Sequence, residues 1–166
     1  FWTKFEKINN NFLNNRKINK LINPISSDLS VLRSSIFSNL VQKVKENIDR
    51  GEENISLFEI GPIFEGKNPG DQIINVCAIS SGYASNPNWN EKGRYIDLFD
   101  VKKDLLHTLY ELGTEKNQIV IETTNLPNYY HPGKSGNISF INNKNNYFAS
   151  FGELQPNIIN QLDIKT

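Results

Sequence analysis

Two apolar stretches separated by a short polar loop are the feature that most limits how this chain can fold. Residues 55–64 (ISLFEIGPIF) and 72–80 (QIINVCAIS) have the length of strands and are rich in isoleucine. The loop between them, EGKNPGD at residues 65–71, contains glycine and proline, which favour a turn. We therefore predict an antiparallel hairpin over residues 55–80.

An amphipathic helix is predicted before the hairpin, over Ser30–Asp49. Its apolar residues recur at three- and four-residue steps, which places them on one face; they are Leu32, Ile36, Phe37, Leu40, Val41, Val44 and Ile48. The start can be capped by Ser26, Ser27, Asp28 or Ser30, and Gly51 can end the helix. A short strand over Lys17–Ile22 is expected to precede it, because Asn23-Pro24 follows as a turn.

The second half of the chain predicts a mixture of one helix and several strands. The expected elements are a loop over Ser81–Arg94 that holds Trp89, a helix over Asp100–Leu112 capped by Asp100, a strand over Gln118–Thr123, and a hairpin of Gly136–Ile141 with Tyr147–Leu154. There is no internal repeat and no evident linker. We therefore expect a single α+β domain over residues 1–166, an antiparallel sheet flanked by helices.

Charge and composition exclude some classes of protein. The chain has 18 basic and 18 acidic residues, so it lacks the basic excess of a strong nucleic-acid binder. No apolar run approaches the roughly 18 residues of a membrane helix. The single cysteine, Cys77, lies in an apolar stretch and cannot form an internal disulfide. We expect a buried, inert thiol and a cytoplasmic protein.

Few residues suggest chemistry on their own. His107 and His131 lack ligand spacing, so no metal site is expected, and no glycine-rich phosphate loop is present. Asp97 and Asp100 are either an acid–base pair or structural groups at a helix start, and the structural interpretation is the simpler one. The aromatic residues near loops either stack on nucleotides or pack in the core and interfaces; they are Trp89, Tyr95, Phe99, Tyr129 and Tyr130.

Four separated segments, in order, carry a resemblance to a known family. They are residues 23–51 (NPISSDLSVLRSSIFSNLVQKVKENIDRG), 57–66 (LFEIGPIFEG), 88–106 with 130–138 (NWNEKGRYIDLFDVKKDLL and YHPGKSGNI), and 151–156 (FGELQP). On these residues the chain resembles the beta subunit of bacterial-type phenylalanine–tRNA ligase, in its class II synthetase-like core domain. Lys103, Gly136 and Gln155 depart from the residues usual in that family.

The resemblance implies a nucleotide site that has lost its charges. In active class II enzymes, the first strand of this hairpin ends in phenylalanine, arginine, any residue and glutamate, and the arginine neutralises the ATP α-phosphate. Here Phe64 is followed by Glu65, and Lys67 stands two residues further on, so both charges are reversed. A glutamate repels a polyphosphate unless a metal intervenes. The resemblance thus implies a catalytically inactive copy with no catalytic, cofactor-binding or metal residues of its own.

The resemblance also implies partners. It suggests a catalytic alpha subunit, two alpha–beta pairs in a heterotetramer, tRNA(Phe) bound by the whole enzyme, and ATP with magnesium as the cofactors of that enzyme. Helix Ser30–Asp49 lies where class II folds pair. Its residues Phe37, Val41 and Val44 are therefore either a docking surface for the alpha subunit or part of the internal core.

Arg33 is expected to be structural, by pairing with a carboxylate or with backbone carbonyls. Two alternatives to the main interpretation stay open. One is an active ligase of another class II type, against which the reversal at Glu65 and Lys67 argues. The other is a regulatory or adaptor protein built on the same fold without ligase activity. Because the chain opens on Phe1 and contains no methionine, we expect a fragment of a longer protein.

Overall fold

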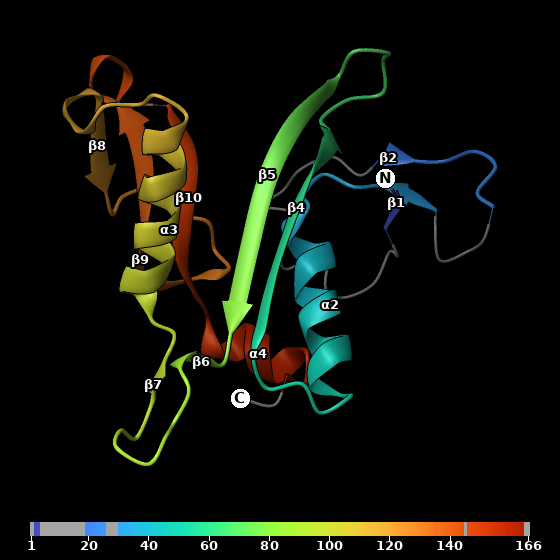
Figure 1. Cartoon of the computed structure of the whole chain (residues 1–166). Coiled ribbons are helices and arrows are strands. Elements are labelled where there is room, and N and C mark those ends of the chain that lie inside the picture. The colour runs from blue at the N-terminus through green and yellow to red at the C-terminus, as the bar shows by residue number, and fades with distance from the viewer. Residues whose placement is uncertain (1, 4–18, 26–29, 145, 165–166) are drawn as a thin grey trace. The chain divides into compact units, whose positions relative to one another are not determined.

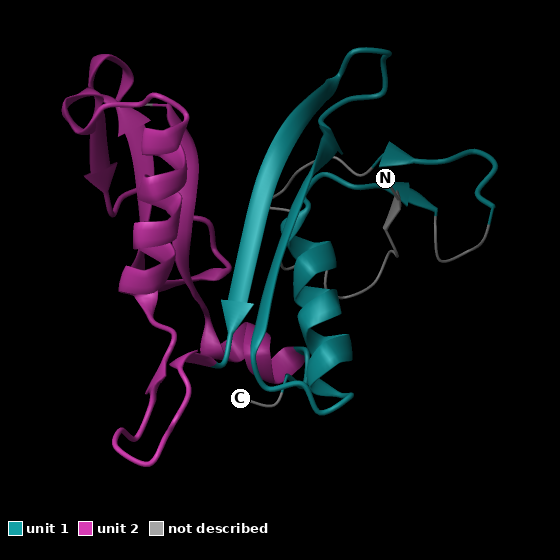
Figure 2. Cartoon of the chain, in the orientation of Figure 1, with its two compact units in different colours: residues 1–82, 162–166 teal, residues 83–161 magenta. Residues whose placement is uncertain are grey.

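A computed structural model of the chain describes residues 2–3, 19–25, 30–144 and 146–164 (Figure 1). The chain divides into two compact units, residues 1–82 with 162–166, and residues 83–161 (Figure 2). The described strands pair in antiparallel sheets and are accompanied by helices, which confirms the α+β class. They form several small sheets rather than one continuous sheet. The single domain over residues 1–166 stays a prediction.

The first unit is built on the long hairpin. Its elements are β1 (Trp2–Thr3), β2 (Asn19–Lys20), β3 (Val31–Leu32), α2 (Phe37–Ile48), β4 (Ile55–Phe64) and β5 (Gln72–Ser81). β4 and β5 pair in unbroken register from Ile55 opposite Ser81 to Phe64 opposite Gln72, which confirms the predicted hairpin. β3 pairs with both β1 and β2.

The core of this unit lies between α2 and one face of the hairpin (Figure 1). Ile36 and Leu40 pack with Ile63 of β4, and the partly buried Leu57, Cys77 and Ile79 pack against them. Because side chains alternate along a strand, these hairpin residues all lie on the same face. The other face of the hairpin is turned away from α2.

The predicted helix over Ser30–Asp49 is wrong at its start, because α2 begins at Phe37. Val31 and Leu32 are extended in β3, where strand pairing prevails over the helical spacing of Leu32. The Oγ of Ser35 accepts a hydrogen bond from the amide of Phe37 at 3.2 Å, whereas Ser26, Ser27 and Asp28 lie outside the described residues. Gly51 ends the helix as predicted, with a φ of 93° that favours glycine.

The second unit combines helices with a three-stranded sheet. Its elements are β6 (Tyr83–Ser85), β7 (Arg94–Tyr95), α3 (Leu98–Glu111), β8 (Ile119–Glu122), β9 (Tyr130–Phe140), β10 (Tyr147–Leu154) and α4 (Pro156–Gln161), with 3-10 turns at Lys116–Gln118 and Ile141–Asn143. β9 lies between β8 and β10, and α3 packs against β10. The predicted strands are present, but β9 begins at Tyr130 rather than Gly136.

The capping of α3 differs from the prediction. Asp97, not Asp100, is the N-cap, and its carboxylate accepts from the amide of Phe99 at 2.8 Å. Asp100 is the third residue of the helix, and its carboxylate accepts from the amide of Asp97 at 2.9 Å. The two aspartates therefore form a capping box, a reciprocal arrangement that satisfies amides at the helix start.

Candidate functional site

The residues that the resemblance assigns to a degenerate nucleotide motif lie where β4 runs into the hairpin loop. The amide of Glu65 donates to the carbonyl of Asp71 at 2.9 Å, so the loop is closed immediately after Phe64. The amide of Asn68 donates to Oδ2 of Asp71, also at 2.9 Å. From another part of the chain, the side-chain amide of Asn19 donates to the carbonyl of Gly66 at 2.9 Å. These contacts give the loop a defined shape.

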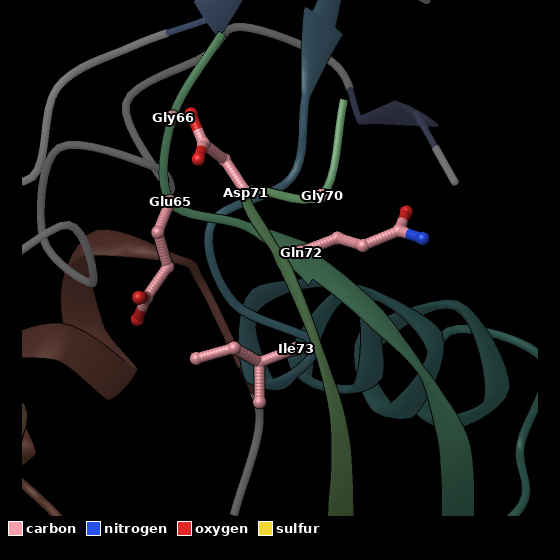
Figure 3. A pocket seen from close by; sticks show the side chains of 6 residues that line it. All are labelled: Glu65, Gly66, Gly70, Asp71, Gln72 and Ile73. Carbon is pink, nitrogen blue, oxygen red and sulfur yellow. The ribbon is translucent and has the colours of Figure 1, made fainter. Parts of the chain in front are cut away.

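An open hollow of about 450 Å³ adjoins this loop, lined by Glu65, Gly66, Gly70, Asp71, Gln72 and Ile73. Figure 3 shows the Asp71 side chain turned toward Gly66 and the Glu65 side chain extending away from it. A Cβ on Gly66 would overlap the Asp71 carboxylate, so a larger residue would displace the Asp71 side chain. The lining carries two carboxylates and no cationic side chain. Such a surface repels a polyphosphate rather than binding it.

The three motif residues lie as the sequence places them, but they do not form a site together. Phe64 is the last residue of β4 and is half-buried, whereas Glu65 and Lys67 are exposed. Lys67 is not among the residues that line the hollow. An ATP-like arrangement of cations around the hollow is therefore absent from the part of the chain that the structure describes.

Arg33 lies behind the motif and joins the segment before α2 to β4. Its side chain is 4% exposed, its Nε donates to the carbonyl of Pro62 at 3.0 Å, and its Nη1 donates to the carboxylate of Glu59. Its own carbonyl accepts from the amide of Phe64 at 2.9 Å. These are the carboxylate and carbonyl contacts that a structural arginine makes.

The Gly61-Pro62 pair in the middle of β4 is explained by the same arginine. A Cβ on Gly61 would lie 2.5 Å from Nη2 of Arg33, so a larger residue would displace the guanidinium. Pro62 has no backbone amide hydrogen that would need an acceptor, and its carbonyl accepts a hydrogen bond from Nε of Arg33. Arg33 and Pro62 are 29 residues apart in the sequence, and nothing in it indicated that they meet.

The docking hypothesis for α2 needs a correction. It required Phe37, Val41 and Val44 to lie on an exposed flank, but all three are buried, with at most 8% of each residue exposed. The alternative that we left open, burial within the chain, agrees with the structure. The solvent-facing side of α2 instead carries the ion pair of Lys43 and Glu46, in which Nζ and Oε2 are 2.7 Å apart.

Asp97 and Asp100 form a structural cluster with Arg94. Two guanidinium nitrogens of Arg94 donate to the two carboxylate oxygens of Asp100, each at 2.7 Å. This bidentate bond lowers the pKa of Asp100 well below its ordinary range, and the bond from the Asp97 amide adds to the effect. A carboxylate held ionised by such bonds is a poor proton donor, so the cluster orders the helix start rather than catalysing acid–base chemistry.

The remaining candidates do not assemble into a reactive centre. Burial raises the pKa of the Cys77 thiol to about 12, which keeps it protonated and unreactive at neutral pH. His131 accepts a bond from the amide of Gly133 at 3.1 Å, and His107 is exposed on α3. Over residues 2–3, 19–25, 30–144 and 146–164, no three side chains of the metal-ligating types gather as a possible site.

The aromatic residues near loops behave in two ways. Tyr95 stacks on Tyr83 with ring centroids 4.3 Å apart, and Tyr129 meets Tyr130 edge to face at 4.6 Å. Trp89 is 97% exposed between β6 and β7. Packing therefore accounts for the tyrosines, and nothing in the described residues gives a nucleotide-binding role to Trp89.

The fold and the site define an α+β domain with a long antiparallel hairpin, and the hollow beside its loop is lined by two carboxylates and by no cationic side chain. Residues 3–166 match the protein family described as "Phenylalanyl tRNA synthetase beta chain CLM domain". The chain belongs to this family.

Relatives support the assignment. A protein named phenylalanine–tRNA ligase beta subunit from Paramagnetospirillum magneticum is 40% identical over 147 residues, which is 87% of this chain and 18% of that protein. A protein of the same name from the Wolbachia of Brugia malayi is 35% identical over 160 residues, which is 96% of this chain and 19% of that protein. A protein of the same name from Ehrlichia canis is 37% identical over 144 residues, which is 86% of this chain and 18% of that protein. The chain thus spans less than a fifth of the length of these relatives.

Proposed function

We propose that this chain is the non-catalytic, class II synthetase-like domain of a phenylalanine–tRNA ligase beta subunit. It scaffolds the catalytic alpha subunit in a heterotetramer and supports aminoacylation of tRNA(Phe) without itself activating phenylalanine. Family membership and the names of the relatives favour this function over that of an adaptor protein without ligase activity. We place the enzyme in the cytoplasm. No helix in the described part of the chain is long and apolar enough to cross a membrane.

The observation that carries the non-catalytic assignment is the charge of the hairpin loop. Glu65 stands where an active enzyme needs an arginine, and Asp71 adds a second carboxylate to the same hollow. Arg33, which lies behind the motif, is bound to Glu59 and to the carbonyl of Pro62. Among the described residues, no cationic side chain lines the hollow to neutralise an α-phosphate. ATP and magnesium belong, in this proposal, to the alpha subunit.

Substitutions in the loop of the assembled enzyme test the non-catalytic assignment. Glu65→Ala and Lys67→Ala in the beta subunit should leave kcat/KM for aminoacylation within about twofold of the unsubstituted enzyme, because neither residue contacts the reacting groups. Titration of the purified chain with ATP, with and without magnesium, should show no heat of binding. Phenylalanine-dependent pyrophosphate exchange by the chain alone, or a large loss of kcat in either variant, would contradict the proposal.

The scaffolding role needs a separate measurement. Arg33→Ala weakens the packing behind the hairpin, so less alpha subunit should co-purify with the beta subunit and less tRNA(Phe) should be charged. The exposed pair on α2 supplies a matched control, Lys43→Ala, which should leave both quantities unchanged. If Arg33→Ala destabilises the domain and the alpha subunit still assembles in full, this domain is not the scaffold.

A further inference from the structure

The first compact unit is made of two separate segments of the chain. Residues 1–82 form most of it, and residues 162–166 return to it after the second unit, residues 83–161 (Figure 2). The chain therefore crosses between the units twice, once after Gly82 and once before Leu162. Contacts inside the first unit hold both of these points, and the contacts differ in kind.

The point where the chain leaves the first unit is held by backbone atoms. Ser81 ends β5 and lies opposite Ile55 of β4. Gly82 follows with a φ of 100°, and a Cβ at this position would lie 2.2 Å from the carbonyl oxygen of Glu53. Because the main chain makes this close approach, no side-chain rotation can release it.

The point where the chain returns is held by a side chain. Leu162 is 8% exposed, and Asp163 follows it at the surface. The ammonium group of Lys45, in the last turn of α2, donates to the backbone carbonyl of Asp163 at 2.9 Å. A charged donor strengthens a hydrogen bond, but 31% of the Lys45 side chain is exposed, so water competes for it. This contact can therefore be broken and formed again.

A second partner for Lys45 lies on α2 itself. Oδ2 of Asp49, four residues further along the helix, is 3.8 Å from Nζ of Lys45. Oδ2 of Asp163 is 4.0 Å from the same atom, on a side chain that is 91% exposed. Both distances are longer than a hydrogen bond, so the carbonyl is the acceptor that Lys45 binds here. If the returning segment leaves, a change of rotamer takes the ammonium group to Asp49, as in other pairs four residues apart on a helix.

The backbone of Asp163 also favours release. Its φ is 53°, in the left-handed region, just after the end of α4. Glycine is the usual residue in this conformation after a helix, because a side chain is crowded there. An aspartate adopts the conformation at a cost, which it recovers when the segment leaves. The held and released forms of the segment are thus closer in free energy than one hydrogen bond alone would make them.

We propose that Lys45 and residues 162–164 form a latch with two states. In the closed state Lys45 binds the carbonyl of Asp163, and in the open state it binds the carboxylate of Asp49 while the segment leaves α2. The hairpin of β4 and β5 stays in place in both states. The latch rests on contacts within the first unit, and it does not depend on the scaffolding function proposed above.

Cleavage by chymotrypsin after Leu162 measures the opening in the full-length beta subunit bound to the alpha subunit. A bond beside a buried residue reaches the protease only when the segment opens, so the cleavage rate follows the open population. Dividing each rate by that of the same bond in urea removes the effect of the substituted residue on the protease. Lys45→Ala should be cleaved about fivefold faster. Lys43→Ala removes an ion pair from the same helix and should leave the rate unchanged.

Two more substitutions distinguish the latch from an ordinary cluster of ion pairs. Asp49→Asn removes the partner of the open state, and Asp163→Gly removes the backbone cost but keeps the carbonyl, so each should slow the cleavage roughly twofold. In an ordinary cluster both variants lose a carboxylate that holds Lys45, and cleavage becomes faster. Unchanged or faster cleavage in either variant would overturn the proposal, as would an unchanged rate in Lys45→Ala. Should Lys45→Ala fail to fold, the other two variants decide.

Discussion

Replacing Arg33 with alanine is the most direct test of how this fold is held together. The substitution removes the bond from Nε to the carbonyl of Pro62 and the bond from Nη1 to the carboxylate of Glu59. A hydrogen bond to a charged group contributes about 1.5 to 3 kcal/mol. The Glu59 side chain is 36% exposed, so water solvates part of it once the arginine is gone, and the lower end applies. We expect a loss of about 2 to 4 kcal/mol in the free energy of unfolding.

Urea denaturation followed by circular dichroism measures this loss, and a thermal scan should show a midpoint lower by roughly 4 to 16 °C for a chain of this size. Lys43→Ala is the control, because it removes an exposed ion pair worth less than about 1 kcal/mol. The loss in the free energy of unfolding for Arg33→Lys should lie between those of the two alanine variants, because the ammonium group of a lysine lacks the planar guanidinium that bonds both acceptors. If the free energy of unfolding of Arg33→Ala equals that of Lys43→Ala within error, the reasoning is refuted.

Four further predictions follow from the described contacts. Phe37→Glu should unfold the first unit, because it buries a charge inside the chain, whereas Lys43→Glu should leave the circular dichroism spectrum unchanged; a folded Phe37→Glu variant would restore the docking hypothesis. Gly61→Ala should destabilise the chain by about 1 to 3 kcal/mol in the same urea assay, because its methyl group displaces Arg33, and no change would show that the guanidinium moves freely. Cys77 should resist iodoacetamide at pH 8 until urea is added, since burial raises the pKa of its thiol to about 12. Asp100 has a folded pKa below its ordinary value of 3.8, so its stabilising effect is present above that pH and is lost below it; the helix signal should fall on acidification toward pH 2, and Asp100→Asn should remove that part of the pH dependence.

The hairpin could be predicted from sequence because its signals are local. Apolar stretches on both sides of a loop with glycine and proline leave few other arrangements, and the structure pairs the two strands in unbroken register. The start of α2 could not be predicted in the same way. Leu32 fits a helical spacing, yet it is extended because β3 pairs with strands elsewhere in the chain, and no local pattern encodes that pairing.

In the candidate site too, some features could be predicted from the sequence and others could not. Glu65 and Lys67 were identified because they interrupt a short motif, and the structure adds the second carboxylate, Asp71, from the far side of the loop. The partner of Arg33 is 26 residues away in sequence, so spacing gave no signal for it. The cap of α3 was placed on Asp100 instead of Asp97, since both aspartates suit a helix start and only the hydrogen bonds distinguish them.

The strand pairs of the described chain mostly join neighbours in sequence. β4 pairs with β5, β6 with β7, β8 with β9 and β9 with β10, and only β1 reaches past a neighbour, to β3. Contacts between residues close in sequence need little loop closure, and chains rich in them fold quickly. Each hairpin can therefore form soon after it leaves the ribosome, before the strands and helices that come later in the chain. A hairpin that forms this early exposes its apolar side chains until α2 and the rest of the first unit pack with it, and strands exposed in this way are prone to aggregate.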